Sequence, residues 1–236
     1  NMSAFDTYNG SSQYSKYRLL FNSVEALRSV VKPGITKKII FTSSGVSYGN
    51  SDSYSESEPS SMQILDPTFS LGFAKLNAEY LLSMLSLEIG ASLTVCRCFS
   101  FISPFLPCNL HYALGNFVDC AVKGKDIFIQ GDGLDYRSYQ HVDDAVDWLL
   151  YLLDSDSNVP LINIGSDLSI SIKELAFLIR DLVSPKISVH ILNQAADPHN
   201  FRRKNYVPTL SISSRLALVN RRSLESSILE FSQSIR

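Results

Sequence analysis

Hydrophobic residues recur at helical spacing in two long segments of the chain. In the first segment they are Tyr17, Leu20, Phe21, Val24, Leu27 and Val31. The second segment runs from about Ser70 to Glu88. Side chains three and four positions apart share one face of a helix, and Pro33-Gly34 and Gly90 follow the two segments as typical helix stops. We therefore expect two long amphipathic helices, over residues 14–32 and 70–88.

Short runs rich in β-branched and aromatic residues alternate with helical patterns. The expected strands are Lys38–Thr42, Ala91–Arg97, Ile127–Ile129, Leu161–Asn163 and Ile187–Leu192. Further helices are expected over residues 112–122, from Asp143 or Asp144 to Leu153, and over residues 171–182 with Ser171 as N-cap. Strands that alternate with helices form parallel sheets with right-handed crossovers. The pattern predicts an α/β fold in which residues 38–42 and 92–96 form neighbouring parallel strands.

Composition narrows the class of protein. The chain has 236 residues, of which 45% are hydrophobic and 19% charged, and its net charge is -2. The length fits one α/β domain or one and a half. The charge gives no reason to expect nucleic acid or an anionic membrane as a partner. No apolar run is long enough to cross a bilayer and no targeting segment is visible, so we expect a cytoplasmic location.

The cysteines and histidines do not predict a metal site. Cys96 and Cys98 fall in an expected buried strand, where their side chains would point to opposite faces. The sequence has no C-x-x-C pair, and its four histidines, His111, His141, His190 and His199, form no cluster with other metal-ligating residues. We expect buried, reduced thiols and no bound metal.

Several motifs follow one another in an order that is similar to a known family. They are Phe41–Gly49 (FTSSGVSYG), Arg97–Pro104 (RCFSFISP), Gly131–Asp144 (GDGLDYRSYQHVDD), Asn163–Ser166 with Ile170–Leu175, and Tyr206–Pro208. Together they resemble the extended short-chain dehydrogenase/reductase family, NAD-dependent nucleotide-sugar epimerases and dehydratases. The resemblance covers essentially the whole chain.

The resemblance implies a Rossmann-type, doubly wound parallel sheet with a smaller C-terminal substrate-binding domain. We expect residues 1–104 to form a partial NAD-binding domain, residues 155–185 to return to its sheet, and residues 105–236 to be mainly substrate-binding. Neither G-x-x-G-x-x-G nor G-x-G-x-x-G occurs in the sequence. In this fold that loop follows the first strand, so the glycine-loop unit is expected to be absent from this chain. The alternative is that the sequence is part of a longer protein that carries the loop.

The same resemblance assigns the chemistry. Ser44 is similar to the serine that hydrogen-bonds the reacting sugar oxygen, and Lys75 to the lysine that binds the nicotinamide ribose and lowers the pKa of a catalytic tyrosine. That tyrosine would stand four residues before Lys75, where this chain has Leu71. Leucine cannot transfer a proton. The alternative interpretations are a turn serine for Ser44 and a surface ion pair with Glu79 for Lys75.

Further residues are assigned to the ligands by resemblance. The cofactor, NAD, would contact Ser43, Lys75 and Ser100. The partner ligand is a nucleoside-diphosphate sugar, which would contact Ser44, Arg137, Arg202 and Arg203, since guanidinium groups suit phosphate oxygens. A solvated basic run is the alternative for Arg202 and Arg203. Asp143 and Asp144 look like a catalytic pair, but a helix-capping role is favoured.

Two functions follow. The first is an NAD-dependent nucleotide-sugar epimerase that acts through a 4-keto sugar; Gly45-Val46 stands where related dehydratases carry an acidic pair, which favours epimerase-like relatives. The alternative is a catalytically impaired binding or assembly subunit, which Leu71 favours. By resemblance, the two long helices would pair across a two-fold axis in a homodimer. The sequence leaves the sugar, and NAD versus NADP, open.

Overall fold

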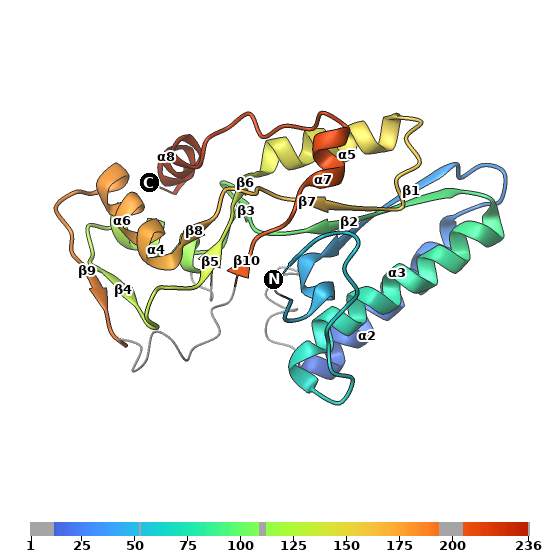
Figure 1. The fold of residues 1–236 in the computed structure, drawn as a ribbon, viewed down its shortest axis with the longest axis horizontal. Coiled ribbons are helices and arrows are strands. Elements are labelled where there is room, and N and C mark those ends of the chain that lie inside the picture. Colours follow the sequence, from blue (N-terminus) through green and yellow to red (C-terminus); the bar gives the residue numbers. More distant parts are fainter. Residues whose placement is uncertain (1–11, 52, 109–111, 194–204, 236) are drawn as a thin grey trace. The chain divides into compact units, whose positions relative to one another are not determined.

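The computed structural model describes residues 12–51, 53–108, 112–193 and 205–235. The chain forms two compact units (Figure 1): unit 1 comprises residues 1–98 and 149–164, and unit 2 comprises residues 99–148 and 165–236. The chain thus leaves unit 1 after residue 98, whereas the sequence placed the boundary at 104, and the returning segment is 149–164 in place of 155–185. The assignment of NAD binding to one part and substrate binding to the other stays a prediction.

Unit 1 is built on a three-stranded parallel sheet with the order β1-β2-β7. The strands are β1 (Lys38–Ser44), β2 (Ser92–Cys98) and β7 (Leu161–Ile164). Strands β1 and β2 pair in register from Lys38 opposite Ser92 to Ser44 opposite Cys98, which confirms that they are neighbouring parallel strands. All three strands end in one row, because Cys98 is also opposite Ile164 of β7.

Two long helices pack beside each other and onto this sheet in unit 1 (Figure 1). They are α2 (Gln13–Val30) and α3 (Ser70–Ile89), and two single turns of 3₁₀-helix, η1 (Gly45–Tyr48) and η2 (Pro67–Phe69), precede α3. Buried side chains of α2, α3 and β1 form one core: Val24, Ile39, Ala78, Leu82, Leu85 and Ile89. Helix α3 ends at Gly90, whose φ of 69° is the left-handed conformation that glycine adopts without strain.

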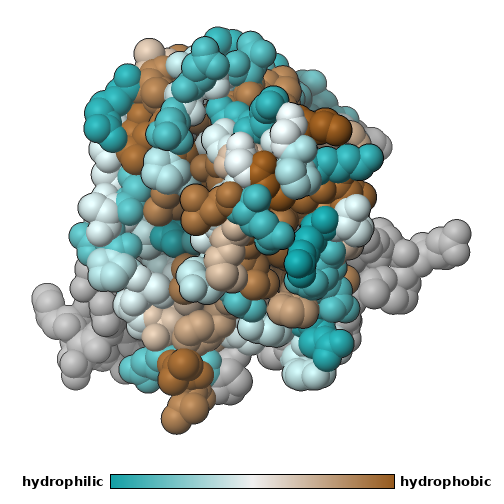
Figure 2. All heavy atoms as spheres, turned by 90° about the vertical axis from the view of Figure 1, so that its right-hand side faces the viewer, coloured by the Kyte–Doolittle hydropathy of each residue, from teal (hydrophilic) through white to brown (hydrophobic). Residues whose placement is uncertain are grey.

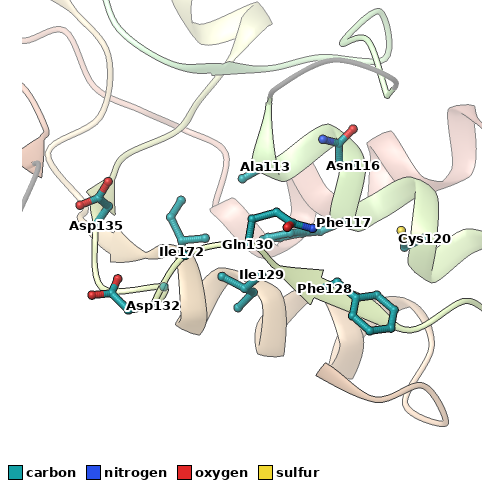
Figure 3. Close-up of a pocket in the computed structure, with 12 residues that line it drawn as sticks. Ala113, Asn116, Phe117, Cys120, Phe128, Ile129, Gln130, Asp132, Asp135 and Ile172 are labelled. Carbon is teal, nitrogen blue, oxygen red and sulfur yellow. The ribbon is translucent and has the colours of Figure 1, made fainter. Parts of the chain in front are cut away.

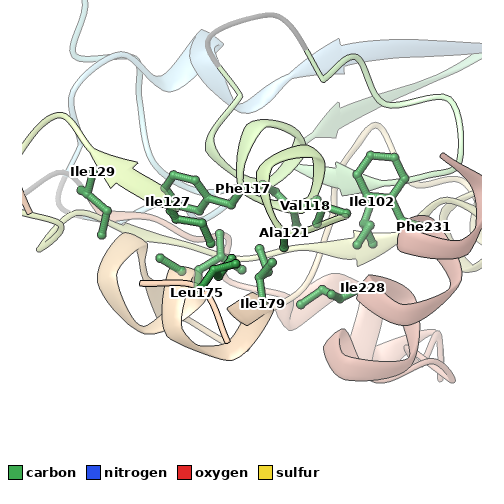
Figure 4. Packing of buried hydrophobic residues seen from close by; sticks show 13 residues of the cluster. Ile102, Phe117, Val118, Ala121, Ile127, Ile129, Leu175, Ile179, Ile228 and Phe231 are labelled. Carbon is green, nitrogen blue, oxygen red and sulfur yellow. The ribbon is translucent and has the colours of Figure 1, made fainter. Parts of the chain in front are cut away.

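Unit 2 combines short strands with three helices around a second core (Figure 4). The strands are β3 (Phe101–Ile102), β4 (Ile127–Ile129), β5 (Tyr136–Arg137), β6 (Gln140–His141), β8 (Ile170–Ser171), β9 (Val189–Ile191) and β10 (Asn205–Tyr206). The helices of the core are α4 (Ala113–Val122), α6 (Ile172–Val183) and α8 (Leu224–Ser234), and α7 (Ser211–Arg215) is a short helix. Helix α5 (Val142–Asp154) leads from unit 2 into unit 1.

Helix starts in unit 2 test two capping predictions. Ser171 is the N-cap of α6 and forms a capping box with Glu174, as the sequence predicted. Helix α5 begins at Val142, so Asp143 and Asp144 lie within its first turn and neither is the cap. The Asp144 carboxylate, which is buried, instead accepts the backbone N–H groups of Arg221 and Arg222, both at 3.1 Å. Asp144 therefore anchors the segment before α8.

Candidate functional site

The candidate site of unit 1 is the carboxyl end of β1, where open parallel sheets place their ligands. Ser44 is the last residue of β1, and its side chain accepts a long hydrogen bond of 3.4 Å from the backbone N–H of Val46 in η1. This contact is the one expected of a turn serine. It occupies a lone pair of the hydroxyl and leaves the proton of Ser44 able to donate to a ligand.

The first turns of α3 lie against this strand end. A Cβ at Gly72 would stand 2.7 Å from the carbonyl oxygen of Val46, so α3 can approach η1 closely because residue 72 has no side chain. One turn later, Lys75 Nζ donates to the carbonyl oxygen of Thr42 at 2.9 Å and lies 5.2 Å from the centre of the Phe41 ring. Leu71, which precedes Gly72, is partly exposed on the first turn.

The environment of Lys75 differs from that of a surface lysine. Burial lowers its pKa, while the nearby Cys98 and Glu79 act in the opposite direction. The alternative interpretation, an ion pair between Lys75 and Glu79 on the helix surface, is not what forms. Glu79 instead forms a bidentate ion pair with Arg97 of β2, with 2.8 Å between Arg97 Nη2 and Glu79 Oε2. Strand register, which brings Arg97 under α3, decides between the two pairings.

Unit 2 carries a candidate site of its own, around Arg137 of β5. Its Nη1 donates to the carbonyl oxygen of Tyr136 at 2.7 Å, and its Nη2 lies 3.7 Å from Asp135 Oδ2. Strand β5 lies between β8 and β10, and Arg137 is opposite Tyr206 in the register of β10. Arg137 therefore belongs to the centre of a small sheet, where its backbone is fixed.

A cavity of about 600 Å³ lies beside this sheet in unit 2 (Figure 3). Its lining comes from α4, β4, the loop after β4 and the start of α6: Ala113, Asn116, Phe117, Cys120, Phe128, Ile129, Gln130, Gly131, Asp132, Gly133, Asp135 and Ile172. Apolar walls with a few polar side chains are typical of small-molecule sites. Asp135 links the cavity to Arg137, because it lines the cavity and faces the guanidinium.

The loop of the cavity is held by the first turn of α6. Lys173 donates its backbone N–H to the Gly133 carbonyl oxygen at 2.9 Å, and Ile172 donates to that of Asp135 at 3.0 Å. Gly133 has a φ of 76°, and a Cβ there would lie 2.9 Å from the Lys173 Cβ. Both features require glycine, so Gly133 allows the loop at the start of the Gly131–Asp144 motif to lie against α6.

Phe128 forms another part of the cavity wall, and contacts that involve two further side chains hold its ring in place. Phe128 stacks on His190 of β9, with 4.9 Å between the ring centres and 19° between their planes. His190 Nε2 in turn lies 3.0 Å from Asp126 Oδ2. These contacts fix the Phe128 ring, which is half exposed and can contact a flat ligand.

Comparison with known proteins decides the family. A family model described as "NAD dependent epimerase/dehydratase family" matches residues 9–165, which is more than half of the chain. The chain belongs to the NAD-dependent epimerase/dehydratase family. The resemblance stated from the motifs is thereby confirmed.

Curated relatives include UDP-glucuronic acid decarboxylases, and two of them serve as examples. UDP-glucuronic acid decarboxylase 5 of Arabidopsis thaliana is 28% identical over 126 residues, which are 53% of this chain and 37% of the relative. UDP-glucuronic acid decarboxylase 1 of Xenopus tropicalis is 24% identical over 207 residues, 83% of this chain and 49% of the relative. The chain thus spans between about a third and half of the length of these relatives.

Solved structures of the epimerase/dehydratase family share the fold. UDP-glucose 4-epimerase of Thermotoga maritima, solved with UDP-glucose, has a TM-score of 0.73 at 23% identity, and the match covers 92% of this chain and 67% of the epimerase. UDP-glucuronic acid 4-epimerase of Bacillus cereus, in complex with UDP-glucuronic acid and NAD, has a TM-score of 0.71 at 20% identity, with coverages of 90% and 65%. These matches confirm the Rossmann-type α/β fold.

The structure places the predicted site residues that it describes in both units. Ser43, Ser44, Leu71 and Lys75 all lie in unit 1, three of them around the end of β1, where Ser43 is buried and donates to Glu79 Oε1. Ser100 and Arg137 lie in unit 2, where the Ser100 carbonyl oxygen accepts the N–H of Gln140 at 3.1 Å. Arg202 and Arg203 lie outside the described residues. The cofactor and substrate roles of all these residues stay predictions.

Two absences hold for the described part of the chain. No group of three or more His, Cys, Asp or Glu side chains in it could hold a metal ion. Every helix in it is too short or too polar to span a lipid bilayer. The cavity could not be predicted from the sequence, because its wall combines segments that are far apart along the chain; the glycines at the start of the Gly131–Asp144 motif were one visible signal.

Proposed function

We propose that the chain binds a nucleoside-diphosphate sugar in unit 2 and NAD at unit 1, as part of a nucleotide-sugar epimerase-type oxidoreductase with impaired proton transfer. The observation that carries the proposal is the cavity of unit 2, whose wall contains Asp135, the ion-pair partner of Arg137. Its size and apolar walls suit a nucleobase, and Asn116 and Gln130 offer amide groups that can both donate and accept. Arg137 offers a guanidinium to a diphosphate.

The residues at the end of β1 fit the chemistry of a sugar oxidation. Bound NAD would supply the hydride acceptor. Ser44 can donate its hydroxyl proton to the sugar oxygen, and Lys75 uses one of its three N–H donors on Thr42, which leaves two for ribose hydroxyls. The remaining requirement is a group that takes the proton of the sugar hydroxyl, and Leu71 cannot do so.

The names of the relatives support a nucleotide sugar. The decarboxylases are named for UDP-glucuronic acid, and the two epimerase structures were solved with UDP-glucose and with UDP-glucuronic acid. A UDP-hexose or UDP-hexuronic acid is therefore the first ligand to test. The second candidate function, a binding or assembly subunit of the same fold, is favoured by Leu71.

Calorimetry tests the binding proposal directly. UDP-glucose and UDP-glucuronic acid should bind, and Arg137→Ala should weaken binding by about ten- to a hundredfold, because a charge-assisted contact of roughly 1.5–3 kcal/mol is lost. Arg180→Ala is a matched control in unit 2, since this arginine contacts Asp181 and the Phe177 ring. If neither ligand binds, or both variants bind equally, the proposal fails.

A homodimer through α2 and α3 is part of the proposal. Some apolar side chains of these two helices are used inside unit 1: Val24 is buried, and Leu20, Leu27 and Leu76 are partly buried. Apolar side chains remain exposed on both helices, namely Leu19, Val30, Tyr80, Met84 and Leu87. Figure 2 shows hydrophobic side chains among hydrophilic ones on one side of unit 1. A second copy of the chain would cover part of this surface.

A further inference from the structure

A buried ion pair lies directly under the candidate site of unit 1. Arg97 and Glu79 have side chains that are 8% and 11% exposed, and the guanidinium binds both carboxylate oxygens. Burial acts to lower the pKa of Arg97, but the hydrogen bond and charge of Glu79 outweigh it and hold that pKa above its usual value. Buried ion pairs contribute little net stability compared with apolar side chains of similar volume. Stability alone therefore does not account for this pair.

The pair is part of a polar row that crosses the whole sheet. Ser43, Arg97 and Asn163 are opposite one another on β1, β2 and β7, one position before the strands end. The Ser43 hydroxyl donates to Glu79 Oε1. The guanidinium of Arg97 lies 4.3 Å from the centre of the Tyr48 ring, and the Tyr48 hydroxyl donates to Asn163 Oδ1 at 2.9 Å. Glu79 is the member of this network that α3 contributes.

Two consecutive turns of α3 are tied to two consecutive residues of β1. Lys75 binds the carbonyl oxygen of Thr42, and Glu79, four residues later, binds the hydroxyl of Ser43. Ser44 follows Ser43 directly. These contacts oppose sliding of the helix along the strand.

We propose that Glu79 is a positioning residue, which fixes α3 against β1 so that Lys75 and Ser44 stand where a ligand needs them. This rests on the proposed function, which gives Lys75 and Ser44 their roles. It goes beyond that function in assigning a task to a side chain that reaches neither ligand. The alternative is that Glu79 only neutralises Arg97.

Two variants separate these roles. Glu79→Met alone leaves the guanidinium of Arg97 buried without its carboxylate and should destabilise unit 1. Adding Arg97→Met removes the uncompensated charge, so the double variant should recover most of the melting temperature. It does not recover the contact with Ser43. A matched control, Glu79→Gln, keeps the length and a polar end that can still bond to Ser43 and Arg97.

The readout is the pKa of Lys75, measured by NMR on lysine-labelled protein with no ligand present and assigned with Lys75→Arg. The direction in which this pKa changes distinguishes loss of the Glu79 charge from displacement of α3. Loss of the Glu79 charge with the geometry intact should lower the pKa of Lys75 further, because Glu79 raises it. Displacement of α3 should move the ammonium into water and raise its pKa toward the ordinary value of about 10.4.

The proposal expects a lower pKa of Lys75 in Glu79→Gln and a higher one in Glu79→Met/Arg97→Met. A double variant whose Lys75 titrates as in Glu79→Gln overturns it, since the geometry would then persist without Glu79. If the double variant does not fold, Ser43→Ala removes the β1 contact with the ion pair intact. The same upward shift is then expected, and an unchanged pKa overturns the proposal. No turnover or ligand is needed, so the proposal can fail separately from the proposed function.

Discussion

Under the proposed function, replacing Leu71 with tyrosine should supply the missing proton-transfer group. Position 71 is on the first turn of α3, directly before Gly72, which approaches the Val46 carbonyl oxygen. It is four residues before Lys75, so the two side chains share a helix face, with about 5–6 Å between Cβ atoms. Leu71 is partly exposed, which leaves room for a larger side chain at this position.

The effect on the new phenol can be worked out from this spacing. If the same spacing of about 5–6 Å separates the Lys75 ammonium from the phenolate oxygen, the positive charge stabilises the phenolate by about 3 kcal/mol at an effective dielectric constant of about 20. That corresponds to about two pKa units, so the phenol should titrate near pH 8 instead of about pH 10. A positioned acid or base of this kind accelerates proton transfer by about 10²–10⁴-fold. Leu71→Tyr should therefore be faster than the natural chain by up to that factor.

The assay combines a titration with a rate. Ultraviolet absorbance should show one additional phenol with a depressed pKa in Leu71→Tyr, and the double variant with Lys75→Met should lose the depression. Turnover of UDP-glucose or UDP-glucuronic acid with added NAD is then compared with Leu71→Phe, which has the ring without the hydroxyl. Equal rates in the Tyr and Phe variants, with both ligands bound, would refute the reasoning, and so would ordinary turnover by the natural chain.

Three further predictions concern stability and assembly. Gly72→Ala should destabilise unit 1 by roughly 1–3 kcal/mol in denaturant unfolding, because the new methyl meets a carbonyl oxygen of η1, whereas Gly131→Ala, with open space around it, should not. Burial raises the pKa of the Cys96 thiol to about 12, so the free energy of unfolding falls as pH rises from about 8.5 through about 12. Cys96→Ala should reduce the slope of this fall by up to about 1.4 kcal/mol per pH unit. An unchanged slope contradicts this prediction. Leu87→Glu should shift light scattering from dimer to monomer, whereas Leu65→Glu, equally exposed but outside the helices, should not.

Local patterns were sufficient for the core of unit 1. The apolar spacing of α3 and its stop at Gly90, and the run that forms β1, are visible in the sequence because each depends on neighbouring residues. The ion-pair partner of Glu79 could not be predicted from local spacing. Helical spacing pointed to Lys75, but Arg97 is brought to Glu79 by the register of two strands, which local spacing does not determine.

The segment that returns to the sheet of unit 1 also shows what local sequence patterns do not determine. Residues 155–185 were expected to return to the sheet, and β7 does so. Helix α6 instead packs its buried face, with Leu175 and Ile179, into the core of unit 2. An amphipathic helix packs its apolar face on an apolar surface. Its sequence does not determine whether that surface is the sheet of unit 1 or the core of unit 2. The cavity was missed for a related reason, because α4, β4 and α6 meet only in three dimensions.

The two units make loss of chemistry separable from loss of binding. In unit 2 the cavity wall, the glycine turn held by α6 and the guanidinium of Arg137 are all present, and none depends on a proton-transfer group. In unit 1 the network around Glu79 remains assembled under Ser44 and Lys75, although a sheet that needed only stability could use apolar side chains in that row. Under the proposed function, one change at the partly exposed position of Leu71 on α3 would account for impaired proton transfer. It leaves intact the parts that would hold a nucleotide sugar, so a single substitution at that position is the decisive perturbation for this protein.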